Sequence, residues 1–221
     1  MIKTIFFDLD GVLTTDKSGS FTVSKYFAEK LGVNVQEVFE YKKQFDEDTD
    51  TGKMSDFDVW EKTCKRFGVG DTFNEKYLQE AFESTPIDEK MVQYAKQLKS
   101  KYNVGIITDN SIARVDAISS KNNWSSIFDI TIISEDVKST KKGTKIFEIA
   151  VARVNAKPTE CIFIDNKQAN VDSAQNAGLI GVYFDDQKRD YKELFKQVDE
   201  IVVTGQQNSL HFGQQFSLVL G

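Results

Sequence analysis

Two aspartates, one residue apart, directly follow an apolar run near the start of the chain. The segment reads "IFFDLDG", so Asp8 and Asp10 come straight after residues that are typical of a buried strand. Carboxylates at such a place repel each other and lose hydration, and both effects cost free energy. We therefore expect Asp8 and Asp10 to perform chemistry or to bind a cation. The alternative is a pair of turn or capping residues, but that role does not require two acids at this spacing.

Polar residues also follow the ends of other apolar runs. They are Thr108, Asp109 and Asn110 after "VGII", Asp165 and Asn166 after "CIFI", and a basic segment beyond "ITIIS" that includes Lys141. In an open parallel sheet, ligands bind outside the carboxyl ends of the strands. Acids, a hydroxyl and a lysine at this edge could hold a divalent cation and a phosphoryl group. The expected cation is Mg²⁺, which prefers one or two carboxylates together with waters and a phosphate oxygen.

The elements that must position these residues are strands that alternate with amphipathic helices. Apolar runs rich in β-branched and aromatic residues occur at 2–7, 104–108, 127–133, 161–165 and 180–184, with a sixth candidate at 201–203. Helical patterns separate them, which predicts right-handed crossovers and a mostly parallel sheet. The continuous apolar character of the runs indicates strands that are buried on both faces. The expected fold class is α/β, with a Rossmann-like three-layer parallel sheet core.

One region breaks this rhythm. Residues 16–85 show helical periodicity without a strand pattern, and in "SDFDVWEKTCKRFG" Ser55 is the expected N-cap and Gly68 the expected stop. We therefore expect an inserted all-helical cap domain that follows the two aspartates, where a lid over a site would attach. The expected domains are 1–15 and 86–204 for the α/β core, 16–85 for the cap, and 205–221 for a C-terminal tail of unknown role.

Bulk composition excludes several classes of protein. The chain has 221 residues, 40% hydrophobic and 28% charged, which suits a soluble globular protein with a packed core. Its net charge of −6 and the absence of a long basic block argue against a nucleic-acid partner. No apolar run reaches the roughly 20 residues of a membrane span. Cys64 and Cys161 have no metal-ligand spacing and fit a reducing compartment, so we expect a cytoplasmic protein, either monomer or homodimer.

Four segments together resemble the motifs of the haloacid dehalogenase-like hydrolases. They are "DLDGVLT" at 8–14, Thr108 after its apolar run, a lysine before "KIFEIA", and "FIDNKQANVDSAQNAGL" at 163–179. The helical insertion is similar to the cap of the subgroup that contains phosphoglycolate phosphatase-like enzymes and β-phosphoglucomutases. Within it, "TGKMSDFDVW" at 51–60 resembles a cap loop that reaches the active site, which makes Lys53 a candidate substrate-binding residue.

The resemblance implies a role for each matching residue. Asp8 would be the nucleophile that forms an aspartyl-phosphate, and Asp10 would be the general acid and base. Thr108 would donate its hydroxyl to the phosphoryl oxygens, and Lys141 would neutralise the charge of nucleophile and phosphate. Asp8, the backbone carbonyl of Asp10, and Asp165 would bind Mg²⁺.

Some positions leave alternatives open. Lys142 has the same chemistry as Lys141, although the spacing within the motif favours Lys141, and Lys53 could be an ordinary solvated side chain. Asp109 and Asn110 are candidate substrate-binding residues. Because the family usually has asparagine directly after the threonine, Asp109 should point away from the phosphate, or the substrate should be less anionic than usual. The only histidine, His211, is expected to be incidental.

The resemblance implies phosphoryl transfer because family members that attack carbon lack an acid at the position of Asp10. We expect a Mg²⁺-dependent phosphatase that hydrolyses a small phosphate ester through an aspartyl-phosphate. The first alternative is a phosphomutase of the β-phosphoglucomutase type, which is weakened because the expected cap contains no histidine. Two non-enzymatic alternatives remain: a phospho-acceptor signalling domain and a catalytically silent binding domain on the same fold.

Overall fold

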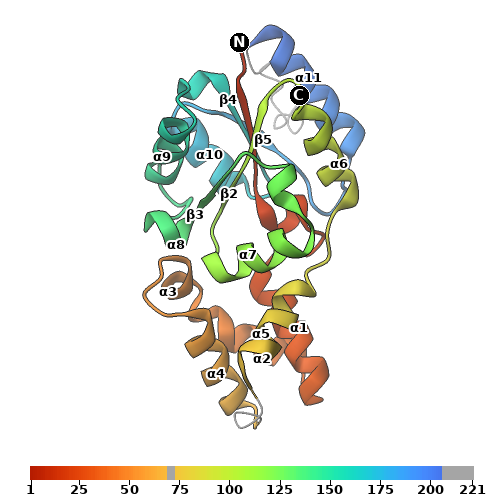
Figure 1. Ribbon diagram of the computed structural model, residues 1–221, viewed down its shortest axis with the longest axis vertical. Coiled ribbons are helices and arrows are strands. Elements are labelled where there is room, and N and C mark those ends of the chain that lie inside the picture. Colours follow the sequence, from red (N-terminus) through yellow and green to blue (C-terminus); the bar gives the residue numbers. More distant parts are fainter. Residues whose placement is uncertain (69–72, 206–221) are drawn as a thin grey trace, which may run out of the picture.

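The sheet consists of five parallel strands in the order β3-β2-β1-β4-β5. The computed structural model describes residues 1–68 and 73–205 and is shown in Figure 1. The strands are β1 (Thr4–Phe7), β2 (Asn103–Thr108), β3 (Ile130–Ile133), β4 (Cys161–Asp165) and β5 (Ile180–Tyr183). Phe7 pairs with Ile106 on one side and with Ile164 on the other. This register brings the residues that follow all three strands to one edge of the sheet.

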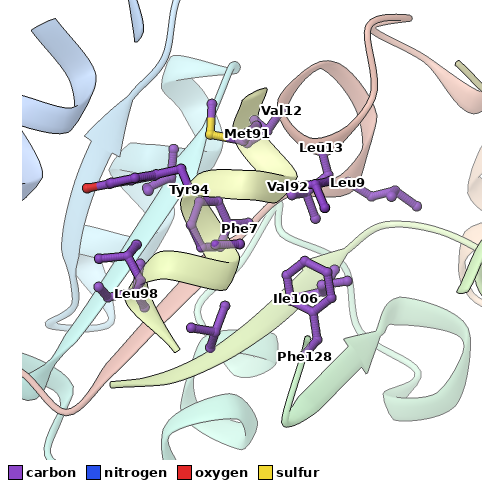
Figure 2. Packing of buried hydrophobic residues seen from close by; sticks show 14 of the residues in the cluster. Phe7, Leu9, Val12, Leu13, Met91, Val92, Tyr94, Leu98, Ile106 and Phe128 are labelled. Atoms are coloured by element: carbon purple, nitrogen blue, oxygen red, sulfur yellow. The ribbon is translucent and has the colours of Figure 1, made fainter. Parts of the chain in front are cut away.

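Helices cover both faces of the sheet, which explains why the strands are apolar throughout. On one face, α6 (Glu89–Leu98), α7 (Ile112–Lys121) and α11 (Tyr191–Thr204) pack on Phe7, Ile106 and their neighbours. Figure 2 shows the α6 residues of this cluster beside Phe7 and Ile106. On the other face lie α9 (Lys145–Arg153) and α10 (Gln168–Asn176), against Phe6 and Phe163. The predicted three-layer α/β core is therefore confirmed.

The sixth strand predicted at 201–203 is wrong, because these residues belong to helix α11. Leu194, Val198 and Ile201 are buried at helical spacing, while Val203 is 85% exposed. A run of β-branched residues resembled a strand, but the spacing of its apolar neighbours favours a helix that packs on the sheet. His211 and all but the first residue of the predicted tail 205–221 lie outside the described residues.

A helical layer lies beyond the carboxyl edge of the sheet (Figure 1). It contains α1 (Gly19–Leu31), α2 (Val35–Lys43), α3 (Asp46–Asp50), α4 (Asp56–Arg66) and α5 (Glu75–Glu83). Phe27 stacks on Trp60 with ring centroids 5.1 Å apart, in an apolar cluster that is separate from the two sheet cores. Ser55 caps α4 as predicted, because its hydroxyl accepts the Asp58 N–H.

Two linkers join the helical layer to the core, and a single antiparallel bridge between Thr14 and Ile87 holds them together. Shorter elements complete the described chain: the kinked turn η1 (Leu9–Leu13), η3 (Trp124–Ser126), α8 (Ser134–Val137) and η4 (Pro158–Glu160). None of the helices in the described ranges is both long and apolar enough to cross a membrane.

Candidate active site

The turn after β1 places Asp8 at the buried edge of the sheet. Asp8 is only 2% exposed, and its Oδ1 accepts the Leu9 N–H at 2.7 Å. Gly11 follows with a φ of 85°, a left-handed conformation that favours glycine. A Cβ at this position would lie 2.2 Å from Asn166 Nδ2. The glycine of "DLDG" therefore allows the first turn and the end of β4 to approach closely.

Lys141 lies between two buried carboxylates. Its Nζ is 2.6 Å from Asp8 Oδ1 and 2.8 Å from Asp165 Oδ2. Burial alone would lower the pKa of Lys141, but the two carboxylates outweigh it and raise the pKa, so the ammonium keeps its proton. Burial, and next the charge of Asp165, raises the pKa of Asp8 to about 7. A further cation near Asp8 would favour the ionised form that a nucleophile needs.

The structure distinguishes the two neighbouring lysines. Lys141 is 2% exposed, whereas the Lys142 side chain is 73% exposed and pairs with Glu47 of the helical layer at 2.9 Å. Asp109 contributes to this arrangement, because its Oδ1 accepts the backbone N–H of Lys141 at 2.9 Å. The aspartate that departs from the family pattern thus holds the loop that carries the buried lysine.

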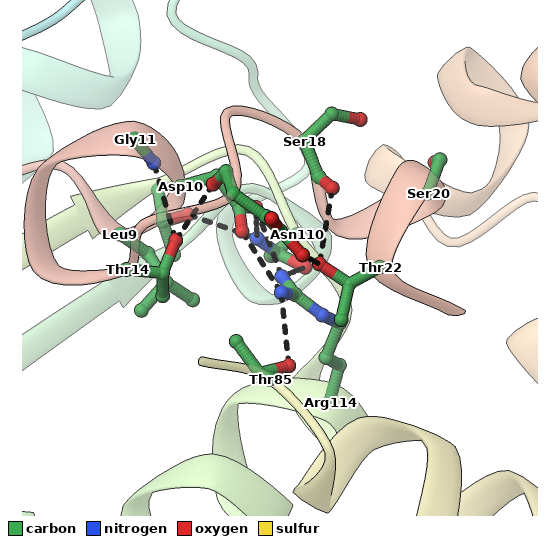
Figure 3. A network of polar contacts seen from close by, with 12 residues as sticks. Leu9, Asp10, Gly11, Thr14, Ser18, Ser20, Thr22, Thr85, Asn110 and Arg114 are labelled. Atoms are coloured by element: carbon green, nitrogen blue, oxygen red, sulfur yellow. Dashed lines mark hydrogen bonds and ion pairs between the residues drawn. The ribbon is translucent and has the colours of Figure 1, made fainter. Parts of the chain in front are cut away.

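Asp10 forms a second charged group, shown in Figure 3, with a residue that the sequence analysis missed. Arg114 of α7 donates from Nη1 to Asp10 Oδ2 at 2.9 Å and from Nη2 to Oδ1 at 2.8 Å. Although burial favours the protonated form, the Arg114 guanidinium outweighs it and lowers the pKa of Asp10. The only sequence signal for Arg114 is its place in the first turn of the helix that follows "TDNS".

Asn110 connects this pair to the end of β2. Its Nδ2 donates to Asp10 Oδ2 at 2.9 Å and to Thr108 Oγ1 at 3.1 Å, and its Oδ1 accepts from Arg114. Thr108 is buried beside the carboxylates, as its position after the strand predicts. Lys53, in contrast, lies apart from the other candidates: its side chain is 65% exposed, 3.8 Å from Asp48, so its role in binding stays a prediction.

The oxygen atoms around Asp8 fit the preferences of Mg²⁺. Asp8 and Asp165 supply two buried carboxylates, and Asn166 Oδ1 is a buried oxygen without a hydrogen-bond partner in the structure. Within the described residues, no group of three or more histidine, cysteine or acidic side chains converges as a metal site. Two carboxylates combined with neutral oxygens and waters is nevertheless the usual magnesium environment in proteins.

A cavity of about 270 Å³ lies between the sheet edge near Asp10 and the helical layer. Its core wall includes Asp10, Asp109, Asn110 and Arg114, and its opposite wall includes residues of α1 to α4. The cavity therefore connects the charged strand ends with the inserted helices. A substrate bound there would contact both parts of the chain.

The fold and the charged strand ends define a hydrolase of a known class. The family model described as haloacid dehalogenase-like hydrolase matches residues 2–178, so the chain belongs to that family. The predicted resemblance is confirmed, and so is the prediction of an enzyme of the phosphatase type.

Among individual relatives, pyrophosphatase PpaX of Bacillus mycoides (strain KBAB4) is 25% identical over 211 residues, which cover 88% of this chain and 90% of the relative. A crystal structure of a HAD family enzyme from Bacteroides thetaiotaomicron matches with a TM-score of 0.70 and 20% identity, over 88% of this chain and 98% of the other. A HAD-like hydrolase from Porphyromonas gingivalis matches with a TM-score of 0.68 and 21% identity, over 90% and 98%. These two structures share the fold of this chain.

Proposed function

We propose that the chain hydrolyses a small phosphate monoester in a Mg²⁺-dependent reaction, with an aspartyl-phosphate on Asp8 as the intermediate. The observation that carries this proposal is the buried group formed by Lys141, Asp165 and Asp8, which lies two residues along the chain from the cavity-lining Asp10. The Bacteroides relative was crystallised with magnesium and inorganic phosphate, and the curated relative is named a pyrophosphatase. Both names support phosphoryl transfer.

The first chemical step transfers the phosphoryl group to Asp8. A carboxylate oxygen of Asp8 attacks phosphorus, and the bond from phosphorus to the ester oxygen breaks. Asp10 gives a proton to the leaving oxygen, so it must react in its protonated form, which the Arg114 pair opposes in the structure without substrate. The Thr108 hydroxyl donates to a phosphoryl oxygen, and the Lys141 ammonium offsets the negative charge of the nucleophile and the phosphate. The hydrogen bond from Asn110 keeps Asp10 beside Thr108 at the strand ends.

The second step hydrolyses the intermediate. Asp10 takes a proton from a water molecule, whose oxygen attacks phosphorus while the bond to Asp8 breaks. Inorganic phosphate leaves, and both aspartates return to their starting states. Asp8, Asp165, the Asp10 carbonyl and Asn166 Oδ1 would hold Mg²⁺, which supplies positive charge that lets carboxylate and phosphate approach each other. Hydrolysis is preferred over a mutase reaction because residues 16–85 contain no histidine.

The test is phosphate release from p-nitrophenyl phosphate with and without Mg²⁺. We expect turnover in the wild type that disappears in Asp8→Asn and on removal of the metal. Asp172→Asn is the matched control, because Asp172 is an exposed aspartate on α10 outside the cavity. Mass spectrometry after an acid quench should find phosphate on the peptide that contains Asp8. Equal turnover by Asp8→Asn and the wild type would refute the proposed nucleophile.

A further inference from the structure

The wall of the cavity that faces the catalytic group is polar but has no role in the two chemical steps. It is formed by residues of the helical layer: Ser20 of α1, Lys42 of α2, Asp46 and Asp50 of α3, and Asp56 and Trp60 of α4. A substrate whose phosphate lies at Asp8 would direct its alcohol part toward this wall. The chemistry of the wall therefore bears on which alcohol the enzyme accepts.

Lys42 is the buried centre of this wall. It is 5% exposed, and its Nζ contacts Ser20 Oγ at 2.9 Å and Asp46 Oδ1 at 2.8 Å. Ser20 Oγ in turn donates to Asp46 Oδ1 at 2.7 Å. The positive charge of Lys42 is thus matched by one carboxylate, and its position is fixed by two partners. Such a neutralised lysine offers little attraction to an additional anion.

Two further acids on this wall have no such partner. Asp50 and Asp56 form no ion pair within the described ranges 1–68 and 73–205. Burial, followed by the charge of Asp109, raises the pKa of Asp50 to about 7, with Asp46 and Asp56 acting in the same direction and Lys42 opposing them. The wall therefore carries three acids and one base. Asp50 experiences an excess of negative charge that a bound cation would relieve.

The cations on the core side of the cavity do not reverse this balance. Arg114 is engaged by Asp10, and the Lys142 ammonium pairs with Glu47. Lys167 lies near the catalytic acids, where its charge lowers the pKa of both Asp8 and Asp10. Arg114 and Lys167 therefore act on the phosphate end of the cavity, whereas Lys142 interacts with Asp50 through its charge but forms its ion pair with Glu47. The opposite end combines unpaired carboxylates with a floor formed by Val23, Trp60 and Phe82.

We propose that the helical wall binds the alcohol part of the substrate and that this alcohol carries a protonated amine. The inference rests on the proposed phosphatase function and names its substrate class: the phosphate ester of a small amino alcohol. An ammonium can donate hydrogen bonds to Asp50 and Asp56 and compensate their charge, while its carbon chain contacts the Trp60 floor. A substrate with a second anionic group on its alcohol part, such as pyrophosphate, would meet these carboxylates and be disfavoured.

The test compares three phosphate esters of equal length whose far ends differ in charge: 2-aminoethyl phosphate, 2-hydroxyethyl phosphate and carboxymethyl phosphate. We expect kcat/KM at pH 8 to fall in that order, with at least about a tenfold difference between the ends of the series, since like charges at a binding surface are strongly disfavoured. Equal values, or a preference for the carboxymethyl ester, would overturn the inference.

Two variants test whether the helical wall causes the preference among the three esters. Asp50→Asn should reduce the ratio of kcat/KM for the aminoethyl and carboxymethyl esters toward unity, whereas Asp48→Asn should keep the wild-type ratio. Asp48 belongs to the same helix but does not line the cavity. An unchanged ratio in Asp50→Asn would also overturn the inference. Wild-type turnover of p-nitrophenyl phosphate separates the two proposals: without it the phosphatase function fails, and with it only the substrate class is in question.

Discussion

Acidic side chains gather near one cavity both at the edge of the sheet and on the wall of the helical layer. The two groups differ in whether each acid is paired with a cation. At the sheet edge each of the three buried acids has a cationic neighbour: Lys141 pairs with Asp8 and Asp165, and Arg114 pairs with Asp10. On the helical wall, Asp50 forms no ion pair among the described residues, and the nearby charge of Lys42 does not offset its burial. Acids that are already paired with cations form a site that is organised before the substrate binds. Acids without such a pair favour a substrate that brings a positive charge.

Removing Lys141 should have the largest effect on stability and activity, because it takes away the cation that distinguishes the sheet edge from the helical wall. Lys141→Met leaves two buried carboxylates without their cation, so we expect the free energy of unfolding to fall by about 3–5 kcal/mol and phosphatase activity to disappear. Added Mg²⁺ should recover part of the stability, because the proposed metal site contains the same carboxylates. Thermal unfolding with and without metal measures both effects. Lys142→Met is the matched control, with an expected change within about 0.5 kcal/mol; equal losses in the two variants would contradict the assignment.

Arg114 offers the next test. Arg114→Met should lower the free energy of unfolding by about 1.5–3 kcal/mol and reduce kcat, because Asp10 would keep only its bond from Asn110. Gly19→Ala should also lower the free energy of unfolding and kcat, although the Arg114 charge remains. The reason is that a Cβ at position 19 would lie 2.4 Å from Arg114 Cζ. Gly143→Ala, whose Cβ meets no atom within 4 Å, is the control. The prediction fails if Gly19→Ala leaves both stability and kcat unchanged.

The smallest effect is expected on the helical wall. Burial raises the pKa of Asp50 from 3.8 to about 7, so ionisation of this group costs stability in the folded state as pH rises through that window. Asp50→Asn should therefore stabilise the protein by about 2 kcal/mol at pH 8, a value reduced for partial solvent screening. The gain should vanish below about pH 4. Chemical denaturation at the two pH values checks this, with Asp48→Asn as the control.

The sequence indicated the fold and most strand-end residues because both depend on local patterns. Asp8, Thr108 and Asp165 each end an apolar run, and parallel pairing of those runs brings them together. Arg114 could not be found in this way, since it meets Asp10 across 104 positions of the chain. The choice between Lys141 and Lys142 was left open for a similar reason: the contact from Asp109 that holds the Lys141 loop is visible only in three dimensions.

The strand order also determines when the site can exist during synthesis. The central strand β1 bonds to β2 through Thr4 and Asn103, and to β4 through Thr4 and Cys161. A nascent chain that has left the ribosome only as far as α9 contains Asp8 and Lys141 but not the strand that carries Asp165. Its central strand then has one open edge, a known template for unwanted pairing. Growth of the chain through β4 therefore completes the proposed catalytic group and closes that edge in the same event.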